Sequence, residues 1–251
     1  MRNRVLVAAG TGAVIAFSSA PAAIAADYPV DVSNLKAANV SVTSGGCTNV
    51  YFNAKYAVRD SRVDPQYFFA SIQADLWLGN KNVDTDYDML QSVSGTWSSS
   101  FFWCPYMGFG TFKISGIHGS YSAAIKNSYQ WINDAPFSVP DTTTFTIKQG
   151  SRFTSAKIRK SGKTRTMTAN ASYFKASDWT NAWTPLAKGT KVALQRQAAN
   201  GKGAWTTVKT VAVGKNGAVS ASYATSATYR YRLSSAGNSV ISAAVTGSLL
   251  K

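Results

Sequence analysis

Apolar side chains recur at every second position through most of this chain, a period typical of β-strands. One run contains Val50, Phe52, Ala54, Tyr56 and Val58, and another contains Phe68, Ala70, Ile72, Ala74, Leu76 and Leu78. Successive side chains of a strand point to opposite faces, so each run predicts a strand with one buried face. Residues 97–104, 109–117 and 129–139 are further candidates. Helical spacing is scarce, and we therefore expect an all-β chain.

The second half of the chain repeats this pattern. Alternating or short apolar runs predict strands at Arg165–Tyr173, 191–198, 205–213, 218–224, 228–234 and 239–246. Asn216 and Gly217 separate two of them, and Asn-Gly is a strong hairpin signal. Short strands without helical crossovers indicate antiparallel β-sandwiches of the immunoglobulin-like kind.

The alternation is interrupted once, near the middle of the chain. Pro136, Pro140 and Asp141 break the pattern, and a run of threonines follows at 142–144. We therefore expect two tandem sandwiches, at 26–141 and 142–251. Each is long enough to bury a core of its own.

Residues 1–25 have the pattern of a secretory signal peptide. Arg2 and Arg4 precede the apolar stretch Val5–Phe17, and Ala23-Ile24-Ala25 fits the small-x-small cleavage motif. The apolar stretch is short for a bilayer span of about 20 residues, and no later stretch is apolar enough to cross. We expect a mature chain that starts at Ala26 and is secreted, free or associated noncovalently with the cell wall.

Cys47 and Cys104 are the two cysteines of the chain. Export to an oxidising compartment permits a disulfide between them. A catalytic thiol would need a nearby base, for which His118 is the one histidine available. Two thiols in an exported chain favour the disulfide.

Positive charge is concentrated in the second half. Residues 27–142 carry seven Lys and Arg against ten Asp, whereas residues 143–251 carry seventeen against one. The formal charge of the whole chain is +15, and it contains no Glu. Such a domain attracts polyanions in a salt-dependent way. Lysines on strands also keep sheet edges from pairing, so solubility is the alternative explanation.

The candidate polyanion site comprises Lys157, Arg159, Lys160, Lys163, Arg165, Arg230 and Arg232. The expected partner is an anionic polymer or polysaccharide of a cell envelope. Specific nucleic-acid recognition is not expected, because no RNA-recognition motif, zinc finger or helix-turn-helix pattern is present. In Tyr229-Arg230-Tyr231-Arg232 the alternation places the tyrosines in the core and the arginines in solvent; an aromatic platform for sugars or bases is the alternative.

Two further groups of residues are candidate binding sites. Asp84, Asp86 and Asp88 alternate in what we expect to be a loop, where their carboxylates are candidate Ca²⁺ ligands. The EF-hand glycine and the closing Glu are missing, and a polar connecting loop explains the same residues. Trp179 and Trp183 lie outside clean alternation; they are either a platform for sugars or a partner, or a plug at the end of a sandwich.

Catalysis is the least supported hypothesis. A single His excludes multi-His zinc sites, and two Cys exclude a four-Cys zinc site or iron–sulfur cluster. No G-x-S-x-G elbow appears, and a Ser-His-Asp triad would have to use His118. An Asp pair that hydrolyses glycosides is the remaining enzymatic hypothesis.

A resemblance covers about residues 185–246. The segment Gly189-Thr190-Lys191-Val192-Ala193-Leu194-Gln195-Arg196 is followed by Trp205-Thr206-Thr207-Val208-Lys209-Thr210, Gly217 and Tyr229-Arg230-Tyr231-Arg232. It resembles the immunoglobulin-like repeats of secreted actinobacterial proteins. The resemblance implies a sandwich fold and no catalytic residues.

These observations predict a secreted, noncatalytic protein whose basic half docks on an anionic envelope polymer. A protein-interaction or inhibitory module that uses Trp179 and Trp183 is the second hypothesis, and an Asp-based glycoside hydrolase is the third.

Overall fold

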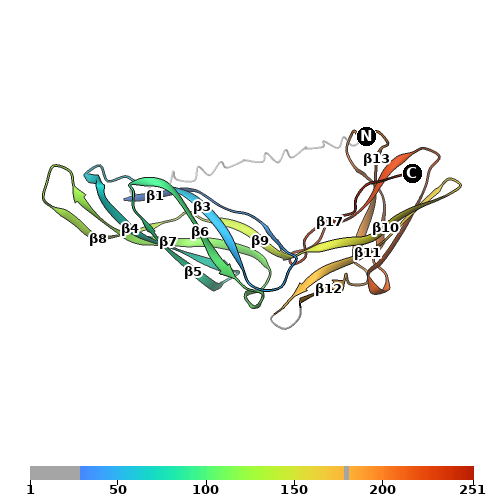
Figure 1. The fold of residues 1–251 in the computed structure, drawn as a ribbon, viewed down its shortest axis with the longest axis horizontal. Coiled ribbons are helices and arrows are strands. Elements are labelled where there is room, and N and C mark those ends of the chain that lie inside the picture. The colour runs from blue at the N-terminus through green and yellow to red at the C-terminus, as the bar shows by residue number, and fades with distance from the viewer. Residues whose placement is uncertain (1–28, 178–180) are drawn as a thin grey trace, which may run out of the picture.

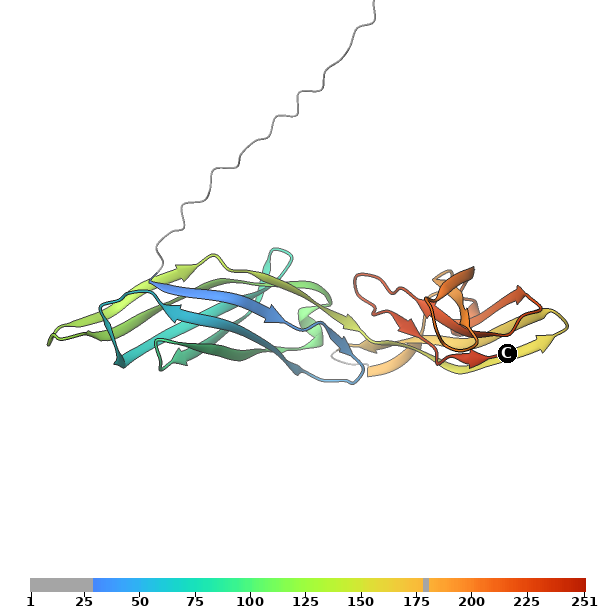
Figure 2. The same cartoon turned by 90° about the horizontal axis from the view of Figure 1, so that it is seen from above.

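The computed structural model describes residues 29–177 and 181–251, and these form two β-sandwiches arranged end to end (Figures 1 and 2). The predicted all-β class and the pair of antiparallel sandwiches are confirmed. The expected signal peptide and Trp179 lie outside the described residues. No helix in the described part of the chain is long and apolar enough to cross a membrane.

The first sandwich consists of two facing sheets. Sheet A has the order β1-β3-β6, and sheet B has the order β2-β9-β7-β4-β5 with β8 also paired to β7. Their strands are β1 (Val30–Ala37), β2 (Val40–Val42), β3 (Thr48–Val58), β4 (Val63–Leu78), β5 (Lys81–Leu90), β6 (Ser94–Trp103), β7 (Gly110–Ile125), β8 (Trp131–Val139) and β9 (Thr143–Gln149), and the short 3₁₀ turn η1 (Pro105–Met107) follows β6.

The second sandwich also has two sheets. Sheet C has the order β10-β11-β12 with β15 also paired to β11, and sheet D has the order β14-β13-β16-β17 with β18 paired to β16. Their strands are β10 (Ser151–Ser161), β11 (Thr164–Ala176), β12 (Asn181–Pro185), β13 (Lys191–Ala198), β14 (Thr206–Ala212), β15 (Ala218–Ala224), β16 (Tyr229–Ser235), β17 (Ala244–Val245) and β18 (Leu249–Leu250), with the turn η2 (Lys215–Gly217) between β14 and β15.

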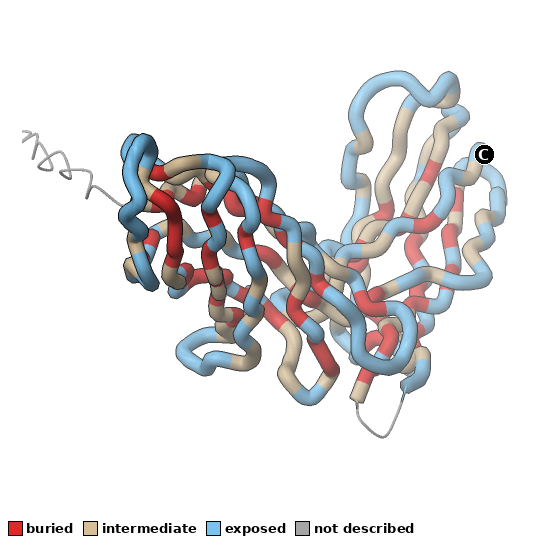
Figure 3. Tube along the Cα trace, turned by 60° about the vertical axis from the view of Figure 1, so that its left-hand side comes forward, coloured by how far each residue is buried: buried red, intermediate tan, exposed pale blue. Residues whose placement is uncertain are grey.

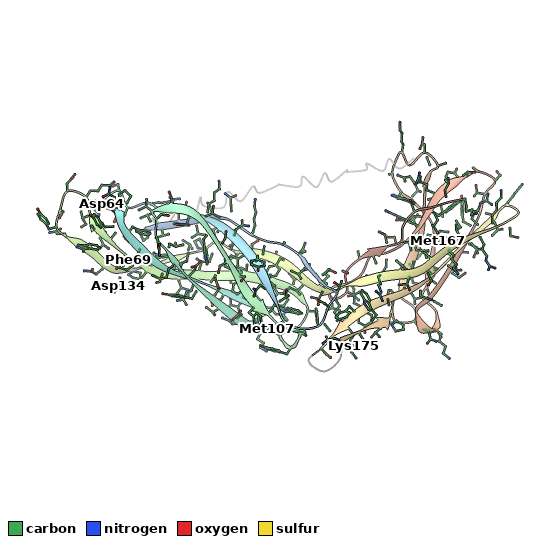
Figure 4. The ribbon with its side chains drawn as sticks, in the orientation of Figure 1. Asp64, Phe69, Met107, Asp134, Met167 and Lys175 are labelled. Carbon is green, nitrogen blue, oxygen red and sulfur yellow. A yellow bond between two sulfur atoms is a disulfide. The ribbon has the colours of Figure 1, made fainter. Side chains whose placement is uncertain are left out.

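Alternation places one face of each strand in a core, as Figure 3 shows along the chain trace. In the first core the Phe52 ring lies 5.0 Å from both Trp97 and Phe101, edge-on to the former and stacked on the latter. The second core is smaller and contains the fully buried Met167 (Figure 4). Two separate buried clusters therefore support the two sandwiches.

Three details differ from the expectations drawn from sequence. β9 begins after the expected boundary at 141, yet it pairs with β7 and β2, so sheet B continues to Gln149. Asp84–Asp88 belong to strand β5 and not to a loop, because β5 pairs along its length with β4. Asn216 and Gly217 adopt the expected left-handed backbone, but they join β14 of sheet D to β15 of sheet C and form no hairpin.

The predicted disulfide between Cys47 and Cys104 is present. Thr48 pairs with Trp103, so the bond extends the β3–β6 ladder by one position. It therefore joins neighbouring strands of sheet A and does not bridge the two sheets. In this respect it differs from the inter-sheet disulfide of immunoglobulin domains, and the fully buried Trp103 adjoins it.

The segment that connects the two sandwiches makes backbone hydrogen bonds to both of them. Gly150 separates β9 from β10, and its N–H donates to the Val42 carbonyl at 2.7 Å. The Gln149 N–H donates to the Val240 carbonyl at 2.8 Å, and its carbonyl accepts from the Ser242 N–H at 2.9 Å. Gly45 lies against the Asn181 side chain of β12. Gln149 and Gly150 thus lie where the backbones of the two sandwiches contact each other.

Apolar packing reinforces this junction. Phe174 and Ala176, at the end of β11, are buried in the same cluster as the first core. Trp183 of β12 packs edge-on against Phe174, with ring centroids 5.6 Å apart, and the Arg152 guanidinium lies 3.7 Å from the Trp183 ring centroid. Part of the second sandwich is therefore anchored in the first.

We expect replacement of both cysteines by serine to lower the free energy of unfolding by about 4 kcal/mol, because the crosslink closes a 57-residue separation. Thermal melting of the double variant against the oxidised parent measures the change. Equal melting temperatures would contradict this role of the bond.

Gly150→Ala is expected to disrupt the junction. A Cβ at this position would lie 2.5 Å from the Thr43 Cγ2 and 2.9 Å from the Val42 carbonyl oxygen, so the backbone would have to shift. Hydrogen exchange should show faster opening at 42–43 and 149–150. Gly247→Ala is the matched control, because nothing lies within 4 Å of its Cβ position. The same exchange rates in both variants would refute the expectation.

Candidate functional site

The candidate polyanion residues occupy three different surfaces of the second sandwich. Lys157 and Arg159 are exposed on the outer face of β10, and Lys160 and Lys163 are exposed at the β10–β11 hairpin. Arg230 and Arg232 point outward from β16, on the opposite side of the sandwich. Arg165 is only 2 % exposed and faces the core. The structure therefore places Lys157, Arg159, Lys160 and Lys163 along β10 and its hairpin, with Lys160 in register with the buried Arg165, and separates Arg230 and Arg232 from them.

The outer face of sheet C is polar and hollowed. A cavity of about 580 Å³ is lined by the polar residues Lys157, Thr168, Asn170 and Ser220 and by small apolar residues, among them Ala169, Ala212, Ala218 and Val219. β10 bulges at Ser155, where the backbone is left-handed and the register with β11 shifts, and Ser155 lines the same cavity. Hydroxyl, amide and ammonium groups thus surround a space that is open to solvent, and these groups suit the hydroxyls and acidic groups of a polysaccharide.

Arg230 and Arg232 are already engaged in local contacts. The Arg232 guanidinium lies 4.3 Å from the Trp205 ring centroid, and its Nε donates to Gln195 Oε1 at 2.8 Å. The Arg230 Nε donates to the Ala199 carbonyl at 3.0 Å. The alternation prediction for β16 is confirmed, since Tyr231 is fully buried and both arginines face outward.

None of the described lysines and arginines of the second sandwich pairs with a described carboxylate. The two ion pairs between described residues, Arg59 with Asp31 and Arg62 with Asp60, both belong to the first sandwich. Residues 150–251 contain sixteen Lys and Arg and a single Asp, Asp178, which lies outside the described residues. Among the described residues, no carboxylate therefore compensates the surface cations of this sandwich.

The candidate calcium ligands lie along one edge strand. Asp84, Asp86 and Asp88 share the face of β5 that turns toward the sandwich interior, and alternate residues of a strand are about 7 Å apart. Asp84 Oδ2 accepts the Phe102 N–H of β6 at 3.2 Å. Within the described part of the chain, no three His, Cys or acidic side chains are close enough to hold one metal ion. Inward-pointing charges are a known protection of exposed sheet edges.

Burial raises the pKa of Asp86, and the charges of Asp88 and Asp84 raise it further, while a hydrogen bond from Ser99 opposes them. One oxygen of this carboxylate is buried without a partner. The ionised form is therefore disfavoured in the folded chain.

Trp183 does not form an exposed platform. It is half-buried at the junction, between Phe174 and Arg152. Trp183 therefore has the plug role that the sequence left open.

Exposed aromatic side chains lie elsewhere, in the first sandwich. Four of them share the outer face of sheet B, namely Tyr67, Phe69, Tyr87 and Trp131, each about half exposed or more, and the rings of Tyr67 and Trp131 are 6.4 Å apart. Figure 4 labels Phe69 on this sandwich. Sequence reasoning missed this face, although Tyr67, Phe68 and Phe69 in succession supply aromatic residues to both faces of β4.

His118 is exposed and its Nδ1 lies 2.6 Å from the Gly116 carbonyl oxygen. Among the hydrogen bonds of the described residues, none links His118 to a serine or aspartate side chain. The geometry needed for a Ser-His-Asp triad is thus not assembled around this residue.

Comparison with known proteins identifies distant structural likenesses. No protein-family model matches the chain, and no curated protein matches it. Among solved structures, the D0–D1 domain of intimin is 12% identical, with 87% of this chain and 97% of that chain covered and a TM-score of 0.25.

Two further solved structures have a similarly low sequence identity and structural similarity to this chain. The human OSCAR ligand-binding domain is 9% identical over 84% of this chain and 95% of its own, with a TM-score of 0.24. BcpA, the major pilin subunit of Bacillus cereus, is 12% identical, with 80% of this chain and 58% of that chain covered and a TM-score of 0.23. Likenesses this distant define neither the function nor the partner of this chain.

Asp86→Asn should stabilise the protein at pH 7, because it removes a carboxylate whose ionised form burial disfavours. A raised folded-state pKa means that the parent loses stability as pH rises through that pKa. The difference between the two chains should therefore be smaller at pH 3.5, where the Asp86 carboxyl of the parent is mostly protonated. Melting temperatures at pH 7 and pH 3.5 measure it. The exposed Asp134→Asn is the control. A gain that is equal at both pH values would contradict the cause given.

Proposed function

We propose that this is a secreted, noncatalytic binding protein whose second sandwich docks on an anionic polymer of a cell envelope. The observation that carries the proposal is the set of surface cations of that sandwich, none of which pairs with a described carboxylate. Uncompensated cations attract polyanions by Coulomb interaction and by release of counterions.

The shape of the outer face of sheet C supports an extended ligand. Lys157 borders the hydroxyl-lined cavity, and Arg159, Lys160 and Lys163 continue along the strand and its hairpin. A polymer that follows β10 and its hairpin would meet these four cations within seven residues. The disulfide and the leader-like residues 1–25 support export, since disulfides persist in oxidising compartments.

A second candidate function is partner binding by the first sandwich. It is favoured by the exposed aromatic residues of sheet B, above all the neighbouring rings of Tyr67 and Trp131. Large exposed aromatic rings are enriched where proteins bind sugars or other proteins. This role replaces Trp183 as the aromatic contact in the interaction hypothesis.

Retention on purified cell-wall material across a salt series tests the leading function. The variant Lys157→Gln/Lys160→Gln/Lys163→Gln should weaken binding, and the slope of log affinity against log salt should fall by about one for each lysine that neutralises an anionic group in the parent. The matched control changes three exposed lysines of the first sandwich to Gln, at Lys36, Lys55 and Lys81, and should bind like the parent.

Two results would reject electrostatic docking: retention by the parent that does not depend on salt, or equal weakening by both triple variants. Wall material stripped of its anionic polymers should retain none of the proteins.

A further inference from the structure

Two arginines lie between the sheets at one end of the second sandwich. Arg165 is on the inner face of β11, directly opposite Tyr223 of β15. Arg196 is on the inner face of β13, directly opposite Tyr231 of β16. The Arg196 Nη1 donates to the Tyr223 hydroxyl across the gap between the sheets at 3.0 Å. The two arginine–tyrosine pairs therefore face each other.

Tyr229 completes this group. The Arg196 guanidinium lies 4.4 Å from the Tyr229 ring centroid, and Tyr229 packs edge-on against Tyr231 at 6.3 Å. The positive charges of Arg165 and Arg196 both act on the Tyr231 hydroxyl, whose pKa is nevertheless raised, chiefly by burial. Tyr231 therefore stays a neutral hydrogen-bond donor.

The polar atoms of this group are incompletely satisfied. Arg165 is 2 % exposed; its Nη1 donates to the Gly162 carbonyl at 3.1 Å, but its Nε is buried without a partner. The hydroxyl of the fully buried Tyr231 also has no partner. Burial of an uncompensated charge destabilises the folded state, and an unpaired buried donor destabilises it further.

The protein supplies no described side-chain carboxylate to compensate these charges. Asp178 is the only acidic residue after position 141, and it lies outside the described residues. The group contains two guanidinium groups, which only donate, and three phenol hydroxyls, each of which has a proton to donate. Such a set recognises an oxyanion, and two positive charges match a dianion better than a carboxylate.

We propose that Arg165 and Arg196, together with the hydroxyls of Tyr223, Tyr229 and Tyr231, bind a phosphate group between the sheets of the second sandwich. Phosphate near neutral pH carries a charge of about −1.5 to −2 and several acceptor oxygens. The Tyr223 hydroxyl accepts from Arg196 and keeps its own proton for the ligand.

The group can be reached from solvent. Arg196, Tyr223 and Tyr229 are each partly exposed. Lys160 pairs with Arg165 in register and is exposed, so it lies on the same face at the rim of the sandwich. This cation would attract the ligand toward the two arginines. The donors of this site lie between the sheets, whereas the lysines proposed to bind the polymer are on the surface. The phosphate site is therefore distinct from the proposed salt-dependent docking surface.

Titration of the whole protein with inorganic phosphate, at constant ionic strength with chloride as the balancing anion, tests the site by calorimetry. We expect one phosphate per chain. Arg196→Gln should weaken binding by tenfold or more, because it removes a charged donor, and Tyr223→Phe should weaken it to a lesser degree, because it removes a neutral one. Lys188→Gln removes one exposed charge from the same sandwich, outside both proposed sites, and should change the affinity less than twofold.

Arg165→Met gives an independent readout. In phosphate-free buffer it should raise the melting temperature, since an unpaired buried charge is replaced by an apolar chain of similar length. It should also abolish the rise in melting temperature that phosphate produces in the parent. If this variant does not fold, Arg196→Gln and Tyr223→Phe decide the question, because both side chains are partly exposed.

Three ligands separate the possible sources of the phosphate. Binding of both glycerol phosphate and inorganic phosphate would support a phosphate group carried by a larger molecule, and binding of inorganic phosphate alone would support the free ion. Acetate binding as tight as phosphate binding would overturn the assignment. So would an equal loss of affinity in Lys188→Gln and Arg196→Gln, or the absence of phosphate binding by the parent.

Discussion

The hydrogen bonds around Gln149 and Gly150 fix how the rest of this molecule is arranged. One continuous stretch of chain leaves sheet B as β9 and enters sheet C as β10, and the segment 238–242 bonds to it from the second sandwich. Because Phe174, Ala176 and Trp183 are packed into the first core at the same place, the junction is both polar and apolar. The two sandwiches are thereby held as one elongated body (Figure 2).

This arrangement segregates charge. The first sandwich holds the acidic residues, among them the inward-facing aspartates of edge strand β5, and both described ion pairs. The second sandwich holds cations on its outer faces and two more between its sheets. Self-repulsion of this kind costs stability unless salt or a bound anion screens it. The same feature links the proposed docking of a polymer to the proposed phosphate site.

Much of the fold could be predicted because burial follows a period of two. β13 and β15 begin and end where the sequence indicates, and the inward tyrosines of β16 follow from the alternation of side chains along the strand. This alternation does not reveal which strands become neighbours, however. The sequence places β9 on the wrong side of a boundary because two prolines and an Asp resemble a linker, whereas its partners are set by long-range pairing with β7 and β2.

The candidate site could be predicted less completely. Arg165 has the same parity as Met167 and Ala169, so the sequence itself places it on a buried face, but its lysine neighbours suggest a solvent-exposed cluster. The aspartates of β5 reverse the usual polarity of a strand, since they point inward at an edge, and so their pattern suggests a loop. Contacts across the gap between sheets, such as that of Arg196 with Tyr223, join residues far apart in sequence and leave no local signal.

The position of the disulfide has a consequence for the coupling of the two sandwiches. Cys47 ends the loop in which Gly45 lies against Asn181 of β12 and Val42 receives the hydrogen bond from Gly150. The bond to Cys104 therefore restrains the very loop on which the second sandwich rests. We expect a reductant to leave the aromatic core of the first sandwich in place and to loosen the loop that ends at Cys47. The rigidity of the junction between the two sandwiches would then depend on the oxidation state of the two cysteines.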